Sequence, residues 1–345
     1  MSQPIGIAVV GTGDWGANLV RNYANLPGAR LVAVCDSDPQ RLQKTAAAYP
    51  TARPAASADE IAAADDVQAV VIASSAVSHH PIARQMLEAG KDVYVEKPLT
   101  LKVADAETLV RTARERDRIL MVGHLLLYHP AVQYMRKMVQ SGDLGDLYYV
   151  YSQRVNLGKV RRDENALWSF APHDLSVILH LIDQEPIDVV ARGSAFLQGQ
   201  VEDVVFVDLR FPGGKMAHVH VSWLDPHKLR KFTVVGSRKM VVFDDMEASE
   251  KIRVYDKGVD RGPEVVSYGD ALTVRSGDIL IPKISLQEPL TLECRHFVDC
   301  VRERKTPLTD GASGLRVVKV LAAAQASLEA GGAPVAVNGQ TAGVS

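Results

Sequence analysis

The first 122 residues alternate short apolar runs with stretches in which apolar residues recur every three or four positions. Such runs are typical of strands buried on both faces, and the recurrence is typical of amphipathic helices. Strands are expected at 5–10, 31–35, 68–73, 92–95 and 119–122. Helices are expected at 14–26, 39–48, 57–63, 79–89 and 102–117. This order predicts an α/β domain with a doubly wound parallel sheet of the Rossmann type.

The pattern changes after Gly123. Apolar and polar residues now alternate, as in His218-Val219-His220-Val221, which predicts strands with one buried face in an open, mainly antiparallel sheet. Strands are expected at 147–155, 187–197, 202–211, 215–224, 230–236 and 239–244. Helices are expected at 130–140, 290–303 and 311–330. This second part is therefore expected to be an α+β domain.

The chain of 345 residues is thus predicted to contain two domains. Residues 1–122 form the Rossmann domain, residues 123–330 form the α+β domain, and residues 331–345 are expected to be a tail. A large open sheet with few helices leaves an apolar face that another subunit can cover. We therefore expect a homo-dimer or a homo-tetramer.

A glycine-rich turn follows the first predicted strand. It reads Gly11-Thr12-Gly13-Asp14-Trp15-Gly16 and leads directly into a predicted helix. In this context Gly11 permits a tight turn, Gly13 lets the backbone approach a pyrophosphate, and Gly16 lets helix and strand pack closely. The helix N-terminus offers free N–H groups to the phosphates. The turn therefore predicts a dinucleotide site.

Asp36 ends the second predicted strand, twenty residues after Gly16. A carboxylate at this position accepts hydrogen bonds from the adenosine ribose and repels a 2′-phosphate. NAD is therefore the predicted cofactor. Arg41 lies nearby in the sequence and leaves NADP possible.

Lys97 follows the predicted strand 92–95 in the sequence Val93-Tyr94-Val95-Glu96-Lys97-Pro98. In open α/β sheets the ligand crevice lies at the carboxyl ends of the strands. Lys97 is therefore expected to project towards the nicotinamide end of the dinucleotide.

These segments resemble those of the Gfo/Idh/MocA oxidoreductases, NAD(P)-dependent enzymes that act on sugars and cyclitols. The resemblance rests on the glycine-rich turn, on Ser78-His79-His80-Pro81 with the following segment 87–91, and on Glu96-Lys97-Pro98. It continues through Phe170-Ala171-Pro172-His173-Asp174 and the segments 292–300 and 306–311.

The resemblance implies a catalytic Lys in the Glu-Lys-Pro tripeptide, together with an Asp and a His four residues apart on a helix. By position the Lys is Lys97 and the His is His173, whereas Ser169 occupies the position of the Asp. Imidazole titrates near neutrality and suits a general base for a sugar hydroxyl, and Lys97 can stabilise charge on the reacting oxygen. Asp174 lies about 100° further around the helix, so it need not replace the missing Asp.

The resemblance also assigns binding residues. Those for the cofactor are Gly11, Thr12, Gly13, Asp14, Trp15, Gly16, Asp36, Ser74, His79, Glu96 and Lys97. Those for the substrate are His124, Tyr128, Arg154, Asn156, Trp168, Ser169 and His173. Arg154 would suit a phosphate or carboxylate of the substrate. No metal is expected, because no His is paired with acids at ligand spacing.

Composition narrows the partners. The net charge of −2 with no basic block argues against nucleic acid, and no apolar stretch is long enough for a membrane span. Three scattered cysteines do not form a disulfide framework, and the first strand begins too early to leave room for a signal peptide. We therefore expect a cytoplasmic enzyme with a small-molecule sugar substrate.

The segment 167–174 is similar to segments of relatives in polysaccharide and nucleotide-sugar pathways, which favours an activated or acidic sugar as the substrate. A dehydrogenase of free sugars or cyclitols is one alternative. A catalytically silent dinucleotide-binding sensor is another. Ser169 supports the sensor, whereas the presence of both Lys97 and His173 counts against it.

Overall fold

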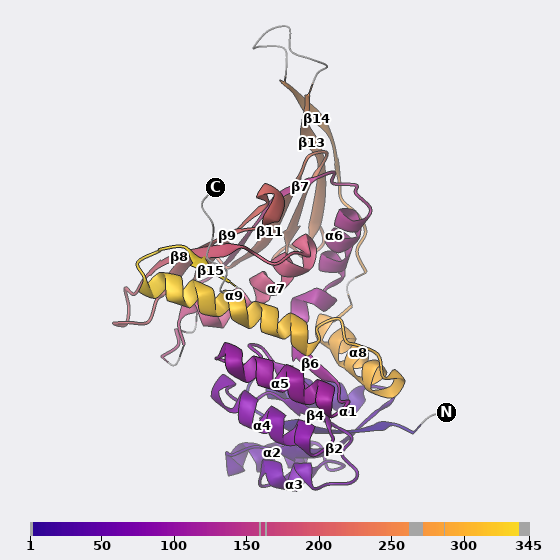
Figure 1. Ribbon diagram of the computed structural model, residues 1–345. Coiled ribbons are helices and arrows are strands. Elements are labelled where there is room, and N and C mark those ends of the chain that lie inside the picture. Colours follow the sequence, from indigo (N-terminus) through magenta and orange to yellow (C-terminus); the bar gives the residue numbers. More distant parts are fainter. Residues whose placement is uncertain (1–2, 159, 163, 262–271, 286, 338–345) are drawn as a thin grey trace. The chain divides into compact units, whose positions relative to one another are not determined.

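The computed structural model describes residues 3–158, 160–162, 164–261, 272–285 and 287–337 (Figure 1). The chain forms two compact units. Unit 1 comprises Met1–Tyr128 and Gln287–Val318, and unit 2 comprises His129–Leu286 and Lys319–Ser345. The predicted division placed all of 123–330 in the second domain. In the structure, the segment from Gln287 to Val318 belongs to unit 1.

Unit 1 contains a six-stranded sheet in the order β3-β2-β1-β4-β5-β6, and every strand pair is parallel. The strands are β1 (Ile5–Val10), β2 (Ala29–Cys35), β3 (Arg53–Ala55), β4 (Ala69–Ile72), β5 (Asp92–Glu96) and β6 (Leu120–Gly123). The order reverses between β1 and β4, which is the switch point where such sheets bind dinucleotides. The predicted doubly wound parallel sheet is confirmed.

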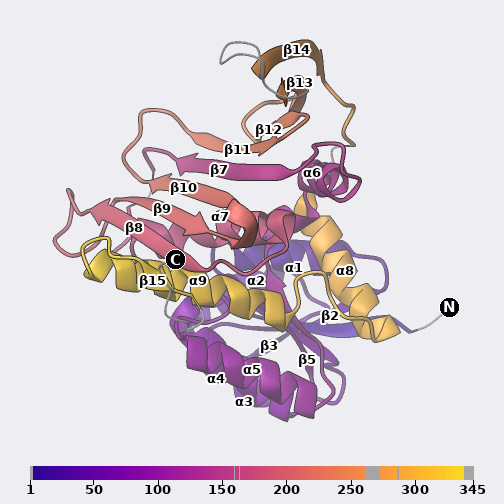
Figure 2. The same ribbon diagram turned by 45° about the horizontal axis from the view of Figure 1, so that its top comes forward.

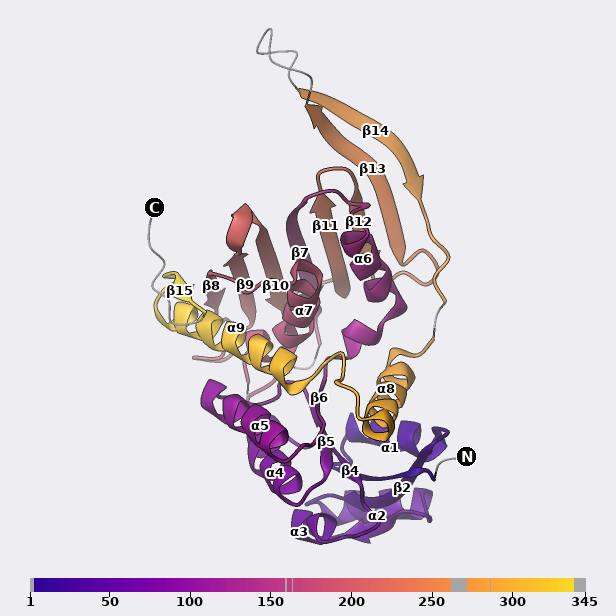
Figure 3. The ribbon, with the colours of Figure 1, turned by 45° about the vertical axis from the view of Figure 1, so that its right-hand side comes forward.

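Helices cover both faces of this sheet (Figure 3). They are α1 (Gly16–Asn25), α2 (Pro39–Ala48), α3 (Ala58–Ala62), α4 (Ala76–Glu88), α5 (Val103–Glu115), the 3-10 helix η1 (Leu125–Tyr128) and α8 (Pro289–Glu303). Apolar side chains of α8 recur at helical spacing and pack into one core cluster with Leu19 and Tyr23 of α1. This packing explains why α8 belongs to unit 1.

Unit 2 contains a nine-stranded sheet in the order β14-β13-β12-β11-β7-β10-β9-β8-β15. Only β7 and β10 pair in parallel among the described strands, and the other pairs are antiparallel. The strands are β7 (Leu147–Val155), β8 (Asp188–Ser194), β9 (Val204–Arg210), β10 (Met216–Ser222), β11 (Leu229–Gly236), β12 (Met240–Asp244), β13 (Ile252–Arg261), β14 (Leu272–Leu280) and β15 (Val335–Ala336). This mixed, mostly antiparallel sheet confirms the predicted architecture.

The helices of this part are α6 (Pro130–Gln140), α7 (Ala166–Ile182), the 3-10 turn η2 (Pro212–Gly214) and the long α9 (Gly311–Glu329), whose residues from Lys319 onwards belong to unit 2. Helix α7 packs against β7, β9 and β10 on one face of the sheet (Figure 2). The spacing of apolar residues did not predict α7, because most residues of this helix are buried and no polar stripe marks the helical period. The hairpin of β13 and β14 was not predicted either.

Part of the predicted tail is ordered. Val335 and Ala336 pair with Val189 and Asp188 at the edge of the sheet. Residues 338–345 of the predicted tail lie outside the described residues.

Candidate active site

The glycine-rich turn has the backbone geometry that its sequence predicts. Gly11 has a φ of +91°, and a Cβ there would lie 2.6 Å from the Ser74 nitrogen. A Cβ on Gly16 would collide with the carbonyl oxygen of Gly11. At Gly13, by contrast, a Cβ would meet only Nη1 of Arg41, at 3.7 Å. The turn is therefore closed at its two ends and open at Gly13.

The N-terminus of α1 has no side-chain cap, unlike that of α2, where the Asp38 carboxylate accepts hydrogen bonds from Gln40 N and Arg41 N. Uncapped helical N–H groups beside an open glycine backbone are the groups that hold a pyrophosphate. This end of unit 1 therefore fits a dinucleotide.

Asp36 is held at the edge of this turn. Its Oδ2 accepts hydrogen bonds from the nitrogen of Thr12 at 2.6 Å and from Oγ1 of Thr12 at 2.9 Å, and its Oδ1 accepts one from Asp38 N at 2.9 Å. Burial alone would raise the pKa of Asp36, but the bonds from Asp38 and Thr12 outweigh it and lower the pKa. The carboxylate is therefore ionised at neutral pH, as recognition of ribose hydroxyls requires.

Glu96 connects the glycine-rich turn to the predicted catalytic lysine. Its Oε1 accepts hydrogen bonds from Nε1 of Trp15 at 2.6 Å and from the Tyr94 hydroxyl at 3.0 Å. Its Oε2 accepts one from the backbone nitrogen of Lys97 at 3.2 Å. Glu96 therefore holds the Trp15 side chain of the glycine-rich turn and the backbone of Lys97 in place.

His79 is buried near the same edge of the sheet. Its Nδ1 lies 2.8 Å from the Pro98 carbonyl oxygen, and its Nε2 lies 3.1 Å from that of Ser74. Burial lowers its pKa. A neutral ring has one N–H, and we assign it to Nδ1 because that contact is shorter. His79 links the end of β4 to the segment after Lys97.

His124 follows β6 and differs from His79 in its surroundings. It is 1% exposed, and neither ring nitrogen has a hydrogen-bond partner among the described residues. Burial, aided by the charge of Lys97, lowers its pKa to about 3. A buried neutral imidazole with two unused nitrogens is costly unless a ligand supplies a partner. His124 is therefore a strong candidate for a ligand contact.

Tyr128, a predicted substrate contact, is held by neighbours inside unit 1. Its hydroxyl is hydrogen-bonded to Oγ1 of Thr309 at 3.0 Å, and its ring lies 5.3 Å from that of His296. These contacts give Tyr128 a packing role, and its contact with the substrate stays a prediction.

In unit 2, three of the predicted substrate residues lie on α7, namely Trp168, Ser169 and His173. The cap is Asn165, whose side chain accepts a hydrogen bond from Trp168 N and donates to Gln325 Oε1. The same oxygen of Gln325 accepts from Nε1 of Trp168 at 3.2 Å. Trp168 is thus fixed by its indole N–H. Ser169 and His173 lie one turn apart on this helix, as the resemblance implies.

Arg154 on β7 forms a buried ion pair with Asp174, the neighbour of His173. Nε of Arg154 lies 2.6 Å from Oδ2 of Asp174. Burial raises the pKa of Asp174, and Arg154 opposes this effect. Asp174 balances the charge of Arg154 within the fold, and a contact between Arg154 and a phosphate or carboxylate of the substrate stays a prediction. Asn156 lies two residues after Arg154. Its Oδ1 has no partner among the described residues and stays a candidate contact.

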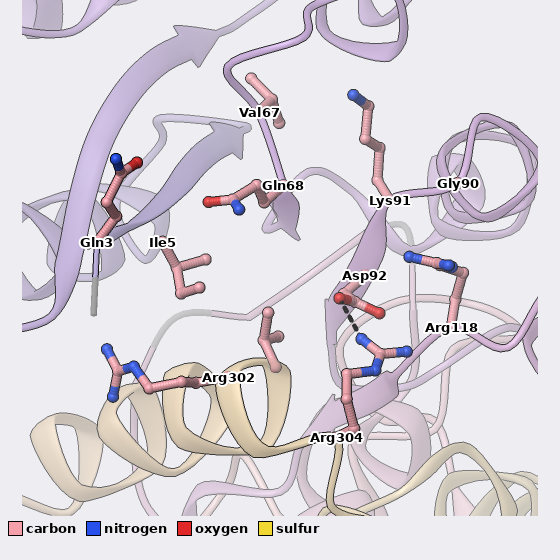
Figure 4. Close-up of a pocket in the computed structure, with 11 residues that line it drawn as sticks. Gln3, Ile5, Val67, Gln68, Gly90, Lys91, Asp92, Arg118, Arg302 and Arg304 are labelled. Atoms are coloured by element: carbon pink, nitrogen blue, oxygen red, sulfur yellow. Dashed lines mark hydrogen bonds and ion pairs between the residues drawn. The ribbon is translucent and has the colours of Figure 1, made fainter.

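A cavity of about 450 Å³ lies at the opposite edge of the parallel sheet, where β1, β4 and β5 begin (Figure 4). Two cationic side chains that line the cavity bond to other parts of the protein. Arg304 donates to Asp92 Oδ2 at 2.7 Å, and Lys91 donates to the Ala64 carbonyl at 2.7 Å. Positive side chains also suit the helix C-termini at this edge. The cavity is therefore separate from the cofactor turn.

The described residues contain no group of three or more His, Cys, Asp or Glu side chains placed to hold a metal ion. None of their helices has both the length and the apolar character needed to cross a membrane.

The sequence did not predict that Glu293 is buried. Glu293 faces inward from α8, where the other inward residues are mostly apolar. Its position in the stripe of Leu290, Cys294 and Phe297 is the signal that could have revealed it, because charged residues are seldom fully buried.

The fold and the cofactor turn define an NAD-binding oxidoreductase architecture, and comparison with known proteins gives the same class. A family model described as an oxidoreductase family with an NAD-binding Rossmann fold matches residues 5–124. A model of the GFO/IDH/MocA C-terminal domain matches residues 132–242. The chain therefore belongs to the GFO/IDH/MocA oxidoreductase family.

Named relatives cover nearly the whole chain. UDP-N-acetylglucosamine 3-dehydrogenase of Acidithiobacillus ferrooxidans is 26% identical over 323 residues, which cover 93% of this chain and 96% of that protein. Inositol 2-dehydrogenase of Pseudomonas fluorescens is 26% identical over 341 residues, with coverage of 94% and 93%. A solved structure from Magnetospirillum magnetotacticum is 30% identical with a TM-score of 0.79, and covers 93% of this chain and 99% of that one.

Proposed function

We propose that the protein transfers hydride between NAD and a secondary alcohol or ketone on the ring of an activated or acidic, nucleotide-linked sugar. In this proposal unit 1 binds the cofactor and unit 2 binds the substrate. The observation that best supports this proposal is that one chain combines three features. They are the open glycine turn with Asp36, Lys97 directly after β5, and His173 on α7. Similarity to a UDP-sugar dehydrogenase over nearly the full length supports the substrate class.

The glycine turn and Asp36 would hold NAD, which would supply a hydride acceptor for the carbon that carries the reacting hydroxyl. His173 takes the hydroxyl proton while the carbonyl bond forms, and it returns the proton in the reverse reaction. Lys97 donates a hydrogen bond to the same oxygen and stabilises the charge that develops there. Glu96 fixes the backbone of Lys97, and the uncharged ring of His124 offers a further donor or acceptor.

Ser169 affects the preferred direction of this reaction. A serine one turn before His173 supplies no negative charge to stabilise an imidazolium, so proton removal from an alcohol gains less than it would beside an Asp. We infer that the enzyme works mainly as a ketone reductase.

We also propose that the uncovered face of the unit 2 sheet joins copies of this chain into a homo-dimer or homo-tetramer in the cytoplasm. Three large side chains on this face are exposed, namely Tyr149, Phe206 and Met216. Antiparallel sheets with an apolar outer face bury it against another layer. Light scattering that reports a monomer at micromolar concentration would contradict the oligomer.

A screen of binding and turnover tests the substrate class. UDP-N-acetylglucosamine, other nucleotide sugars, the corresponding free sugars and inositol are each offered with NAD, and NADH fluorescence is followed. We expect turnover of a nucleotide sugar and at least about tenfold lower kcat/KM for the free sugar, since each 1.4 kcal/mol of lost binding is tenfold.

The alternatives give different results in the same screen. Equal or better activity on free sugars or inositol would favour a free-sugar or cyclitol dehydrogenase. The similarity to inositol 2-dehydrogenase supports this alternative. Binding of NADH and sugar without turnover in either direction would favour the silent sensor.

A further inference from the structure

Glu293 is a carboxyl group in an apolar setting. It is 0% exposed, and neither of its oxygens has a hydrogen-bond partner of good geometry among the described residues. It sits on α8 one turn from Phe297, whose ring packs edge-on against that of Tyr94 at 5.8 Å between centroids. An ionised carboxylate in such a place costs several kcal/mol, so the group must be protonated or balanced.

Among the described residues, the groups that act on Glu293 include no cation. The titratable side chains that act on it or feel its charge are Tyr23 on α1, Tyr94 and Glu96 on β5, Tyr128 on η1 and Cys294 on α8. Tyr94 links the two carboxyl groups, because it donates to Glu96 and also acts on Glu293. Space for this link depends on Gly123, where a Cβ would lie 2.6 Å from Tyr94 Oη and 3.0 Å from Oε1 of Glu96.

Glu96 and Glu293 together hold one negative charge and one proton, and each goes to a different residue. Glu96 accepts three hydrogen bonds and feels the positive charge of Lys97, and these oppose the rise of its pKa through burial. Glu293 has no comparable donors, and burial together with the charge of Glu96 raises its pKa well above the usual range. The charge therefore resides on Glu96 and the proton on Glu293.

We propose that protonated Glu293 is a positioning residue for the cofactor site, because it lets Glu96 alone carry the charge that holds Trp15 and the Lys97 backbone. Ionisation of Glu293 would place a second negative charge beside Glu96 and loosen both contacts. NADH affinity is therefore expected to fall as alkaline pH removes this proton. The inference rests on the assignment of the cofactor to this turn and is independent of the substrate.

The test compares the wild type with Glu293→Gln, which keeps the shape of the side chain and cannot ionise. NADH binding is measured by fluorescence titration from pH 6 to pH 10. The wild type should lose about tenfold in affinity at the alkaline end, as expected for loss of a hydrogen bond to a charged group. Glu293→Gln should match the wild type at neutral pH and lose much less affinity at alkaline pH.

Two companion variants separate the causes. Trp15→Phe removes the hydrogen bond to Glu96 and should weaken NADH binding by about tenfold at neutral pH already. Glu303→Gln changes an exposed acid at the end of the same helix, paired with Lys305, and should leave the wild-type curve unchanged.

Superposed pH curves for the wild type and Glu293→Gln would overturn the proposal. If Glu293→Gln does not fold, the wild type still decides, because infrared spectroscopy at neutral pH must show the C=O band of a protonated carboxyl group that vanishes on alkaline titration. Absence of that band would equally overturn it. Failure of the wild type to bind NADH at any pH, with the band present, would instead defeat the cofactor assignment.

Discussion

The region around the glycine turn in unit 1 and the region around α7 in unit 2 hold their polar groups in different ways. Around the glycine turn, the constraints are backbone ones. Gly11 needs a positive φ, Gly16 needs the absence of a side chain, and Asp36 bonds to the Thr12 backbone. Around α7, the constraints are side-chain pairs between different elements, such as Arg154 of β7 with Asp174 of α7 and Trp168 of α7 with Gln325 of α9. The glycine turn is thus set mainly by its backbone, and the surroundings of α7 are set by side-chain pairing.

The largest effect is expected for the two residues that we propose as catalytic, one in each unit. Lys97→Ala and His173→Ala should each lower kcat by about 10²–10⁴-fold, because each removes a positioned group that handles the proton or the developing charge. NADH affinity should stay close to that of the wild type. Steady-state kinetics and NADH fluorescence measure the two quantities.

His227→Ala changes an exposed histidine in the turn after β10 and serves as the control, with unchanged kcat. A His173→Ala enzyme that retains more than about a third of the wild-type kcat would remove His173 from the role of base.

Arg154→Met breaks the buried ion pair with Asp174, which is the most direct test of the side-chain pairing in unit 2. The change leaves the buried Asp174 without its partner and should lower the free energy of unfolding by about 3–5 kcal/mol at pH 8. Asp174 already has a raised pKa, so its ionised form destabilises the fold above the unfolded pKa. The deficit of the variant should therefore shrink as the pH falls and Asp174 gains a proton. Denaturant unfolding at pH 8 and pH 5 measures it.

The exposed pair of Arg84 and Glu88 provides the matched control, since Arg84→Met should cost no more than about 1 kcal/mol. The double variant of Arg154→Met and Asp174→Leu should recover much of the lost stability. A single variant as stable as the wild type would show that the pair contributes nothing.

Gly13→Val tests the local geometry of unit 1. Because a Cβ fits at this position in the folded protein, the melting temperature should change little. The side chain would occupy the approach of the pyrophosphate, and overpacking of about 1–3 kcal/mol corresponds to a loss of about 5–150-fold in NADH affinity. Gly16→Ala, by contrast, should lower the melting temperature as well. Unchanged NADH affinity in Gly13→Val would disprove the assignment of the turn.

The smallest effect is expected for Ser169→Asp, which adds to α7 the charge that the resemblance implies at this position. A carboxylate one turn before His173 stabilises the imidazolium, so the low-pH limb of the oxidation profile should move to higher pH and the maximal oxidation rate should rise. Ser169→Asn gives the control without charge. A profile that coincides with the wild type would show that position 169 does not act on His173.

The same contrast explains which parts of the structure could be predicted from the sequence. The Rossmann sheet, the glycine turn and Asp36 could be predicted because strand, turn and helix signals lie within about thirty residues of one another. Helix α7 has no polar stripe, so its periodicity gave no signal, and its position came only from the resemblance. The strands β13 to β15 were missed as well.

Within the site, the side-chain pairings could not be predicted. Tyr128 is hydrogen-bonded to Thr309, which lies 181 residues further along the chain. Arg154 of β7 pairs with Asp174 of α7, and Glu293 of α8 acts on the region of Tyr94 and Glu96 in β5. Residue type and spacing say nothing of such pairings. They depend on which surfaces meet in three dimensions.

The membership of α8 in unit 1 has a consequence for how the protein is made. The ribosome completes the six strands of the parallel sheet early, but the helix that covers part of one face emerges only after about 160 further residues of unit 2. At synthesis rates of 5–20 residues per second, the apolar surface around Leu19 and Tyr23 waits uncovered for about 8–30 seconds. During this interval the nascent chain presents a natural binding surface for chaperones, and a gene fragment that ends before α8 would leave that surface permanently exposed.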